Sequence, residues 1–154
     1  MSEKGKKAVR GFEVISSHEG KGIKLPVRKT SRSAGYDLEA SEDVLIEVGK
    51  IAVVSTGLKA YMAGDEYLGI HIRSGLSFRN SLSLINDEGI IDADYYNNAD
   101  NEGHIQIGII NLGDKPFMVN KGERIAQAIF KKYLKVDDDD AEGERKGGMG
   151  STGQ

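Results

Sequence analysis

The stretch Ile105-Gln106-Ile107-Gly108-Ile109 decides the fold, because large apolar residues occupy every second position along it. Side chains at i, i+2 and i+4 of a strand share one face, so all three isoleucines can lie against a core. The same spacing recurs elsewhere, at Val44, Ile46 and Val48 and at Leu68, Ile70 and Ile72. Glycine turn signals separate these segments, at Glu19-Gly20, Gly64-Asp65, Gly113-Asp114 and Lys121-Gly122. Short strands with such turns predict an all-β, antiparallel sandwich or barrel.

One segment, IAQAIFKKYL from Ile125 to Leu134, fits two kinds of secondary structure. Ile125, Ile129 and Tyr133 stand four residues apart, which is the spacing of a helix face. Because the rest of the chain is rich in strand patterns, we predict that this segment is also a strand.

Composition excludes several classes of protein. The chain has 154 residues, which fits one domain, and it has no cysteine, so a disulfide framework and a cysteine nucleophile are excluded. A formal net charge of −3 argues against nucleic acid held on a broad basic face. No apolar run approaches the ~18–20 residues that span a bilayer, and the first residues lack the apolar core of a signal peptide. We therefore expect a cytoplasmic protein that binds neither nucleic acid nor membrane.

The composition changes near Val136. Asp137 to Asp140 is a run of four carboxylates, and a glycine-rich end follows it. Charge repulsion and glycine entropy together predict a mobile tail. We therefore divide the chain into a β domain at 1–136 and an acidic linker with a flexible C-terminal lid at 137–154.

Three segments carry residues suited to binding or catalysis. Arg73-Ser74-Gly75 combines an arginine fork, a hydroxyl and a flexible amide, which suits phosphate, although a plain turn at a strand end has the same composition. In the segment from Gly89 to Tyr95, Asp92 and Asp94 would share one face of a flat strand and Tyr95 the other. A carboxylate there could be a general base, and a polar hairpin arm is an equal alternative. The stretch 145–153 could form an anion-binding nest or a flexible end.

The three histidines, His18, His71 and His104, show no metal-binding spacing, so we expect surface or turn positions for them. An EF-hand loop placed on the aspartate run also fails, because Met149 falls where a glutamate is required.

Taken in order, these segments resemble the trimeric dUTPases (deoxyuridine triphosphate nucleotidohydrolases) over nearly the whole chain. Five motifs of that family occur in the family's order: Ser33 to Leu38, Arg73 to Ser77, Gly89 to Tyr95, Gly122 to Gln127, and the tail around Gly147 to Gly153.

The resemblance implies an antiparallel β jelly roll assembled as a homotrimer with shared active sites. It implies Mg2+-dependent hydrolysis of dUTP to dUMP and pyrophosphate, a reaction of pyrimidine nucleotide metabolism that excludes uracil from DNA. In this family's pattern Asp92 is the general base that activates water for attack on the α-phosphorus. Tyr95 packs on the deoxyribose, and Asn86 helps to read uracil.

The resemblance also implies the remaining contacts of the nucleotide. Asp37 would touch water ligands of a magnesium ion held mainly by the substrate phosphates, as Mg2+ tends to retain waters. The tail would close over nucleotide bound at a neighbouring subunit. The implied substrate-binding residues are Arg73, Ser74, Gly75, Asn86, Gly89, Ile91, Tyr95, Gln127, Arg145, Gly148, Met149, Gly150, Ser151 and Thr152.

Three features depart from the family's pattern. Glu144 stands where the tail arginine is common, so the phosphate role passes to Arg145, and Met149 replaces the usual tail aromatic. The segment Tyr96 to Gly103 is longer than the usual turn, and its polarity predicts an exposed hairpin loop.

Two other functions remain open from the sequence. One is a dCTP deaminase, which resembles dUTPases in fold and second motif. The other is a dUTPase of the phage type that also acts as a regulatory protein-binding module, for which the longer loop is the single favourable feature.

Overall fold

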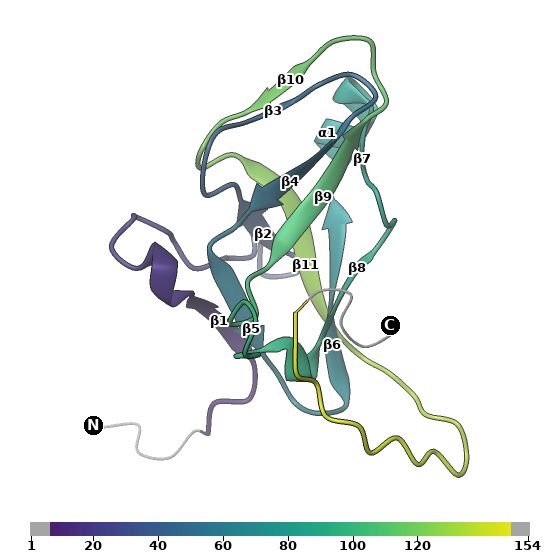
Figure 1. Cartoon of the computed structure of the whole chain (residues 1–154). Coiled ribbons are helices and arrows are strands. Elements are labelled where there is room, and N and C mark those ends of the chain that lie inside the picture. Colours follow the sequence, from purple (N-terminus) through teal and green to yellow (C-terminus); the bar gives the residue numbers. More distant parts are fainter. Residues whose placement is uncertain (1–6, 149–154) are drawn as a thin grey trace.

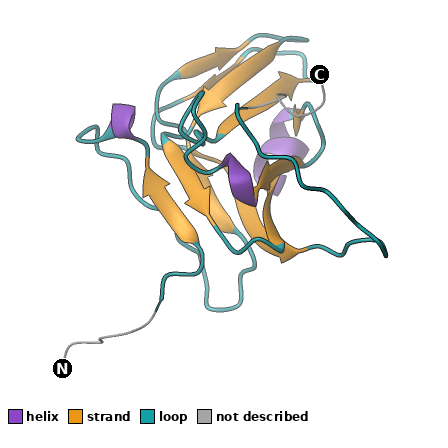
Figure 2. Ribbon diagram, turned by 60° about the horizontal axis from the view of Figure 1, so that its bottom comes forward, coloured by secondary structure: helices purple, strands orange, loops and turns teal. Residues whose placement is uncertain are grey.

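The computed structural model describes residues 7–148 of the chain. Eleven strands, one α-helix and two short 3-10 helices follow one another along it (Figure 1). The strands are β1 (Gly11–Val14), β2 (Tyr36–Glu39), β3 (Val44–Ile46), β4 (Ile51–Ser55), β5 (Leu58–Tyr61), β6 (Glu66–Ile72), β7 (Leu82–Leu84), β8 (Gly89–Asp92), β9 (Gln106–Asn111), β10 (Phe117–Val119) and β11 (Arg124–Lys132). The helices are η1 (Ser16–His18), α1 (Ser74–Asn80) and η2 (Ala93–Tyr95), drawn in purple in Figure 2.

All strand pairs are antiparallel, which confirms the predicted all-β jelly-roll class. A four-stranded sheet has the order β2-β11-β6-β8, and a three-stranded sheet has the order β4-β9-β7. The pairs β1-β5 and β3-β10 complete the arrangement. One apolar core lies between these sheets, and Ile105, Ile107 and Ile109 are buried in it as the alternation predicts.

β11 confirms the strand prediction for the ambiguous segment. It pairs with β2 on one side and β6 on the other, and its register with β2 shifts between Arg124 and Ala126. This bulge lets Ile125 and its neighbour Ala126 both face the core, which interrupts strict alternation. Ile129 is only partly buried and Tyr133 is exposed, so the four-residue spacing in the sequence does not mark one buried helix face.

The strand predicted through Val48 is wrong at its end. β3 stops at Ile46, and Val48 lies exposed in the turn that leads to β4. Gly49 adopts a left-handed φ of 73° there, and the amide of Lys50 donates to the carbonyl of Glu47. The turn ends the alternation before Val48 can reach the core.

Asn111, at the end of β9, is fully buried and joins three segments of backbone. Its amide nitrogen donates to the carbonyls of Ile46 (3.0 Å) and Lys115 (2.7 Å), and its Oδ1 accepts from the amide of Gly113 (2.9 Å). This side chain therefore fixes the turn between β9 and β10 against β3.

We expect Asn111→Leu to lower the free energy of unfolding by about 2–4 kcal/mol, because it leaves buried backbone groups without partners. Urea denaturation at neutral pH and fixed protein concentration measures this change. Asn120→Ala is the matched control, since Asn120 is exposed and contacts only Glu123 through its side chain. Equal stability of Asn111→Leu and the wild type would contradict the structural role assigned to this amide.

Among residues 7–148, no helix combines the length and the apolar character that crossing a bilayer requires.

Candidate active site

The first, second and fourth motifs meet at one end of the four-stranded sheet. Gln127 on β11 lies opposite Asp37 on β2 and His71 on β6. Arg124 Nη1 is 3.4 Å from Asp37 Oδ2, and Arg73 donates from Nη1 to the carbonyl of Arg124 at 3.2 Å. The sequence therefore correctly groups Asp37, Arg73 and Gln127, and the structure adds Arg124 to them.

Arg73 stands directly before α1, a helix that the sequence analysis did not predict. Ser74 and Gly75 form the first turn of this helix, where backbone amides have no partner within the helix. A Cβ atom added at Gly75 would meet nothing within 4 Å in the described chain. The space over Gly75 is thus open to a ligand.

A pocket of about 350 Å³ adjoins this end of the sheet. Its lining includes Asp37 and Arg124 together with three lysines, Lys24, Lys29 and Lys121. The excess of cations suits a ligand with several negative charges.

The third motif begins at Gly89, opposite Ile70 of β6, and reaches the other end of the same sheet at Asp92. Asp92 pairs with Tyr67 near the start of β6, whereas Arg73 follows the last residue of that strand. Tyr67 and Arg73 are six residue steps apart along the strand, which corresponds to roughly 20 Å. One chain therefore holds Arg73 and Asp92 far apart.

A second pocket, of about 440 Å³, contains the third motif. Asn86, Gly89, Ile91, Asp92 and Tyr95 all line it, as the sequence analysis expected of a nucleotide site. Gly89 has a packing reason as well, because a Cβ atom there would lie 3.2 Å from the Cβ of Ile70.

Asp92 and Asp94 are not two residues of a flat strand. β8 ends at Asp92 and η2 begins at Ala93, so the chain turns between the two carboxylates. Both nevertheless bind Arg145, which donates from Nη2 to Asp92 Oδ2 (2.7 Å) and from Nε to Asp94 Oδ1 (2.8 Å). The side chain of Arg145 is only 8% exposed. Its hydrogen bond to Asp94 is the largest of the effects that raise the pKa of Arg145.

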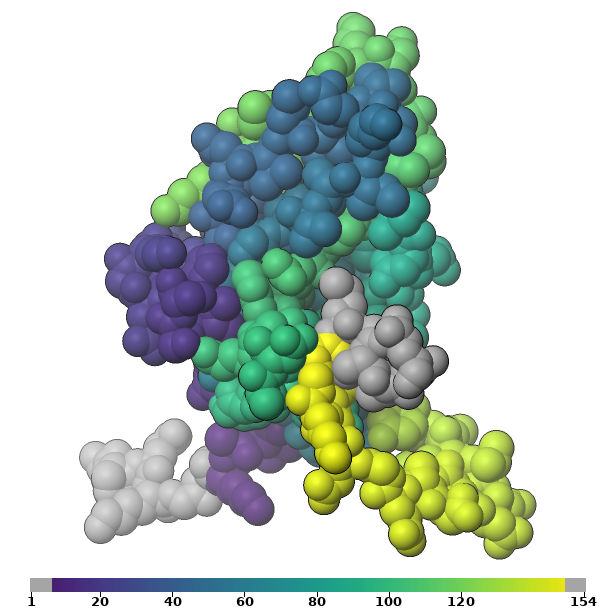
Figure 3. Space-filling view, in the orientation of Figure 1, coloured from purple at the N-terminus to yellow at the C-terminus, as the bar shows by residue number. Residues whose placement is uncertain are grey.

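The tail meets the third motif within the same chain. Residues 134–144 are exposed and leave the body of the protein, and the chain then returns to Asp92 (Figure 1). Figure 3 shows this returning segment in yellow beside the green segment that contains Tyr96 to Gly103. Arg145 lies 5.6 Å over the ring of Tyr95, and the amide of Gly148 donates to Asp100 Oδ2 at 3.3 Å. The expected tail contacts of Met149, Gly150, Ser151 and Thr152 lie outside the described residues.

The segment 96–103 only partly matches the expected exposed hairpin loop, because Asn97, Ala99 and Asp100 are exposed whereas Asn98 and Gly103 are buried. Asn98 is 8% exposed, and its side chain bonds the carbonyl of Tyr95 and Oδ1 of Asn101, both at 2.8 Å. Polar side chains close hydrogen bonds inside the segment, which is why a polar sequence is folded against the protein here.

His104 also corrects a sequence expectation, because it is partly buried behind Tyr95. Its carbonyl accepts a hydrogen bond from the Tyr95 hydroxyl (2.8 Å), and its Nε2 accepts one from the amide of Gly57 (3.0 Å). Burial, helped by the nearby ring of His18, lowers the pKa of His104 to about 4. Glu102 opposes this shift.

We expect His104 to make folding sensitive to acid. The unfolded chain takes up this proton near pH 6.5 and the folded chain only near pH 4, so stability falls as the pH drops through that window. The loss should reach about 3 kcal/mol at most. Urea denaturation between pH 7.5 and 4 at fixed protein concentration measures it. His104→Gln should flatten the dependence and His18→Gln should largely keep it; an unchanged slope in His104→Gln would refute the assignment.

Comparison with known proteins agrees with this geometry. The family model for dUTPase matches residues 21–153. The chain is 46% identical over 147 residues to the deoxyuridine 5'-triphosphate nucleotidohydrolase of Lactococcus lactis subsp. lactis, covering 94% of this chain and 98% of that one. The chain belongs to the dUTPase family.

Solved structures of dUTPases share the fold. The crystal structure of the dUTPase from Streptococcus mutans matches with a TM-score of 0.78 at 42% identity, over 82% of this chain and 98% of that chain. The dUTPase from phage phi11 of S. aureus matches with a TM-score of 0.72 at 20% identity, over 88% and 97%, which speaks for the fold alone.

Within this dUTPase, the described residues contain no cluster of three or more carboxylate, histidine or cysteine side chains placed to hold a metal ion. Asp37 lies beside Arg124, and Glu39, the cross-strand partner of Arg124, lines the same pocket. Such a set fits a magnesium ion that a triphosphate brings with it, since Mg2+ commonly uses one or two carboxylates together with substrate phosphates.

Two charged side chains of the candidate site received no role in the sequence analysis. Arg124 follows the glycine turn of the fourth motif and faces Asp37. Its positive charge next to that turn was the feature of the sequence that could have indicated a site residue. Asp94 shares Arg145 with Asp92, and its position two residues after Asp92 was noted without a role.

Proposed function

We propose that Asp92 is the general base of this dUTP diphosphatase. The chain hydrolyses dUTP to dUMP and pyrophosphate, as its family does. The observation that carries the proposal is the pocket in which Asp92 stands beside Tyr95 and Asn86, with its carboxylate half-exposed and open to water. A carboxylate in that position can take the proton of a water molecule as its oxygen attacks the α-phosphorus.

The walls of this pocket support a nucleoside as its occupant. The ring of Tyr95 would pack on the deoxyribose and leave no room for a ribose 2′-hydroxyl. Asn86, with the backbone of the connection between β7 and β8, would read the uracil. Ile91 supplies an apolar wall, and Gly89 keeps β8 close to β6.

The opposite end of the sheet supports a triphosphate. Arg73 offers a guanidinium group, which suits phosphate oxygens, and Ser74 and Gly75 offer a hydroxyl and amides over open space. Gln127 lies next to Asp37 across the strand pair. Magnesium bound to the phosphates would neutralise their charge for the attack, and Asp37 would hold its water ligands.

Roughly 20 Å of β6 separates Arg73 from Asp92, which favours different copies as the sources of these two groups at one site. We therefore propose a homotrimer in which the Arg73 end of one copy faces the Asp92 pocket of the next. Exposed apolar residues around that pocket support the contact, since such groups commonly mark interfaces. They are Ile51, Val53, Ile85 and Ile90.

The tail would complete the site as a lid. Arg145 binds Asp92 and Asp94, so it would exchange these carboxylates for substrate phosphate on closure. That the lid acts at a neighbouring copy remains a prediction.

Release of pyrophosphate from dUTP, dCTP, dTTP and UTP, each with magnesium, tests this function. We expect rapid release from dUTP and poor release from the other three, because Tyr95 disfavours the ribose and the connection between β7 and β8 selects uracil. Ammonia formed from dCTP at a comparable rate would instead establish the deaminase activity that the fold can also support.

A further inference from the structure

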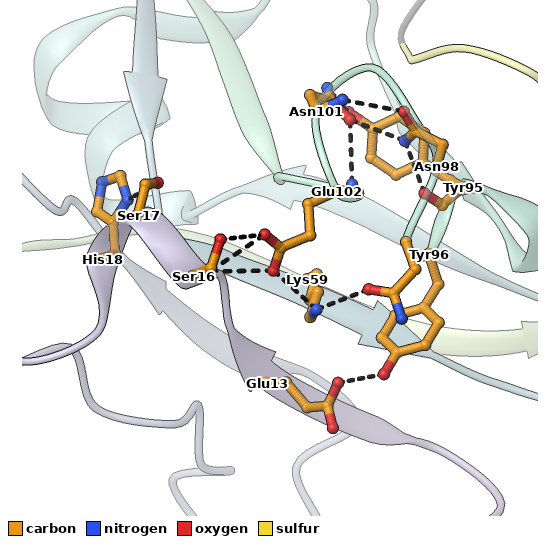
Figure 4. A network of polar contacts seen from close by, with 12 residues as sticks. Glu13, Ser16, Ser17, His18, Lys59, Tyr95, Tyr96, Asn98, Asn101 and Glu102 are labelled. Carbon is orange, nitrogen blue, oxygen red and sulfur yellow. Dashed lines mark hydrogen bonds and ion pairs between the residues drawn. The ribbon is translucent and has the colours of Figure 1, made fainter.

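The segment Tyr96 to Gly103, here called the asparagine loop, is unusually well bonded for a polar loop. Asn98 and Asn101 lie at its centre, and Figure 4 shows both side chains directed toward Tyr95. Asn101 Nδ2 donates to the hydroxyl of Tyr95 at 2.8 Å, and Asn98 Nδ2 donates to the carbonyl of the same residue at 2.8 Å. Tyr95 is thus held at both its ring end and its backbone.

The hydroxyl of Tyr95 is saturated by this arrangement. It accepts from Asn101 and donates to the carbonyl of His104 at 2.8 Å. The residue is 7% exposed, and burial raises the pKa of the phenol. Because two hydrogen bonds on different sides fix the oxygen, the ring cannot swing without breaking at least one of them.

Asn101 is in turn fixed by the loop. Its Oδ1 accepts from Asn98 Nδ2 (2.8 Å) and from the amide of Gly103 (3.1 Å). Gly103 has a φ of 92°, and a Cβ atom there would lie 2.8 Å from the carbonyl oxygen of Tyr95. The loop thus packs closely on the backbone of the residue that it holds.

The outer side of the loop is attached to the N-terminal part of the chain. Glu102 accepts hydrogen bonds from the amide of Ser16 (3.0 Å) and from Lys59 Nζ (2.8 Å), and the hydroxyl of Tyr96 bonds Glu13 (Figure 4). Lys59 Nζ also donates to Asn97 Oδ1 at 2.6 Å. These contacts keep the loop, and with it Asn101, in one position relative to the pocket.

We propose that the asparagine loop is a positioning element for Tyr95, and that Asn101 sets how strictly the enzyme rejects the ribose 2′-hydroxyl. This inference rests on the proposed function, in which the ring of Tyr95 packs on the deoxyribose. A ring that excludes one hydroxyl group by contact must be held rigidly, since a small displacement would admit it. Asn101 acts through Tyr95 and does not itself line the pocket.

Asn101 also lies next to the tail, so the test must distinguish its effect on Tyr95 from its effect on the tail. A Cβ atom at Gly148 would lie 2.9 Å from Asn101 Nδ2, so the loop also touches the tail. Asp100 provides the matched control, because Asp100 Oδ2 accepts from the Gly148 amide and makes no hydrogen bond to Tyr95. Asp100→Ala therefore removes the tail contact and keeps both hydrogen bonds of the Tyr95 hydroxyl.

The measured quantity is the preference for dUTP over UTP, taken as the ratio of their kcat/KM values. We expect Asn101→Ala to lower this preference about 3- to 10-fold, the effect of one hydrogen bond. Tyr95→Phe, which keeps the ring and removes the anchored oxygen, should lower it to a similar extent. The double variant should show little further loss, because both changes remove the same interaction. Asp100→Ala should change kcat/KM for both nucleotides alike and leave the preference intact.

Calorimetric titration with dUMP and UMP gives the same comparison without turnover, and thermal unfolding shows whether each variant is folded. An unchanged preference in folded Asn101→Ala, or additive losses in the double variant, overturns the proposal. If Asn101→Ala does not fold, the preference of Tyr95→Phe alone tests the proposal. A preference for dUTP over UTP in Tyr95→Phe equal to that of the wild type also overturns the proposal. A wild type that does not prefer dUTP to UTP would instead refute the proposed role of Tyr95 itself.

Discussion

Asp92→Asn is expected to lower kcat for dUTP by about 10²–10⁴-fold while leaving the fold and nucleotide binding nearly unchanged. An amide cannot take the proton of the attacking water, which is the role proposed for this carboxylate. The replacement is nearly isosteric, and its carbonyl oxygen can still accept from Arg145 Nη2. Since the side chain of Asp92 is half-exposed, loss of its negative charge should change the free energy of unfolding little.

Asp94→Asn is the matched control, because Asp94 binds the same arginine and stands two residues away. Steady-state pyrophosphate release and calorimetric titration with a non-hydrolysable dUTP analogue separate turnover from binding. The control should remain within a few-fold of the wild type. Turnover of Asp92→Asn within a few-fold of the wild type would remove Asp92 from the role of base.

Mixing two inactive variants is expected to restore activity. Arg73→Ala removes a phosphate contact at one end of β6, and Asp92→Asn removes the base at the other end. In a trimer whose sites combine both ends from different copies, random assembly of equal amounts gives about a quarter of the sites both intact groups. Specific activity should therefore rise from near zero to about a quarter of the wild-type value.

The control is a mixture of Asp92→Asn with the double variant Arg73→Ala/Asp92→Asn, in which no site can contain the base. Chains must be exchanged by joint refolding, and mass spectrometry of intact assemblies shows that mixed trimers form. Mixed trimers without recovered activity would contradict a site shared in this way and would require both groups to act within one chain.

Alternation of apolar and polar residues in the sequence predicts the strands that have one face buried in the core. Leu68 and Ile70 of β6, like the isoleucines before and within β9, lie in the core as their spacing requires. The pattern fails where the backbone departs from a regular strand. Val48 follows the end of β3, and the bulge near Ile125 brings two consecutive residues, Ile125 and Ala126, into the core. Such departures depend on register with other strands, which one sequence does not specify.

The candidate site shows the same division. Asp92, Tyr95 and Asn86 are found together because one short stretch of sequence carries them. Arg145 could be assigned to a tail motif, but its pairing with Asp92 and Asp94 depends on how the chain returns across 53 and 51 residues. The asparagine loop was predicted to be exposed because its residues are polar. Polar side chains that satisfy one another inside a loop have the same composition as those that face water.

The separation of Arg73 and Asp92 along β6 has a consequence for how this enzyme responds to dilution. If every working site needs two copies, a dissociated chain keeps its fold and all its reactive groups, yet hydrolyses nothing. Specific activity would then fall as the protein concentration drops below the dissociation constant of the assembly, and substrate that binds across the contact would oppose that fall. The amount of enzyme in a cell would thereby set the activity of each molecule as well as the number of molecules.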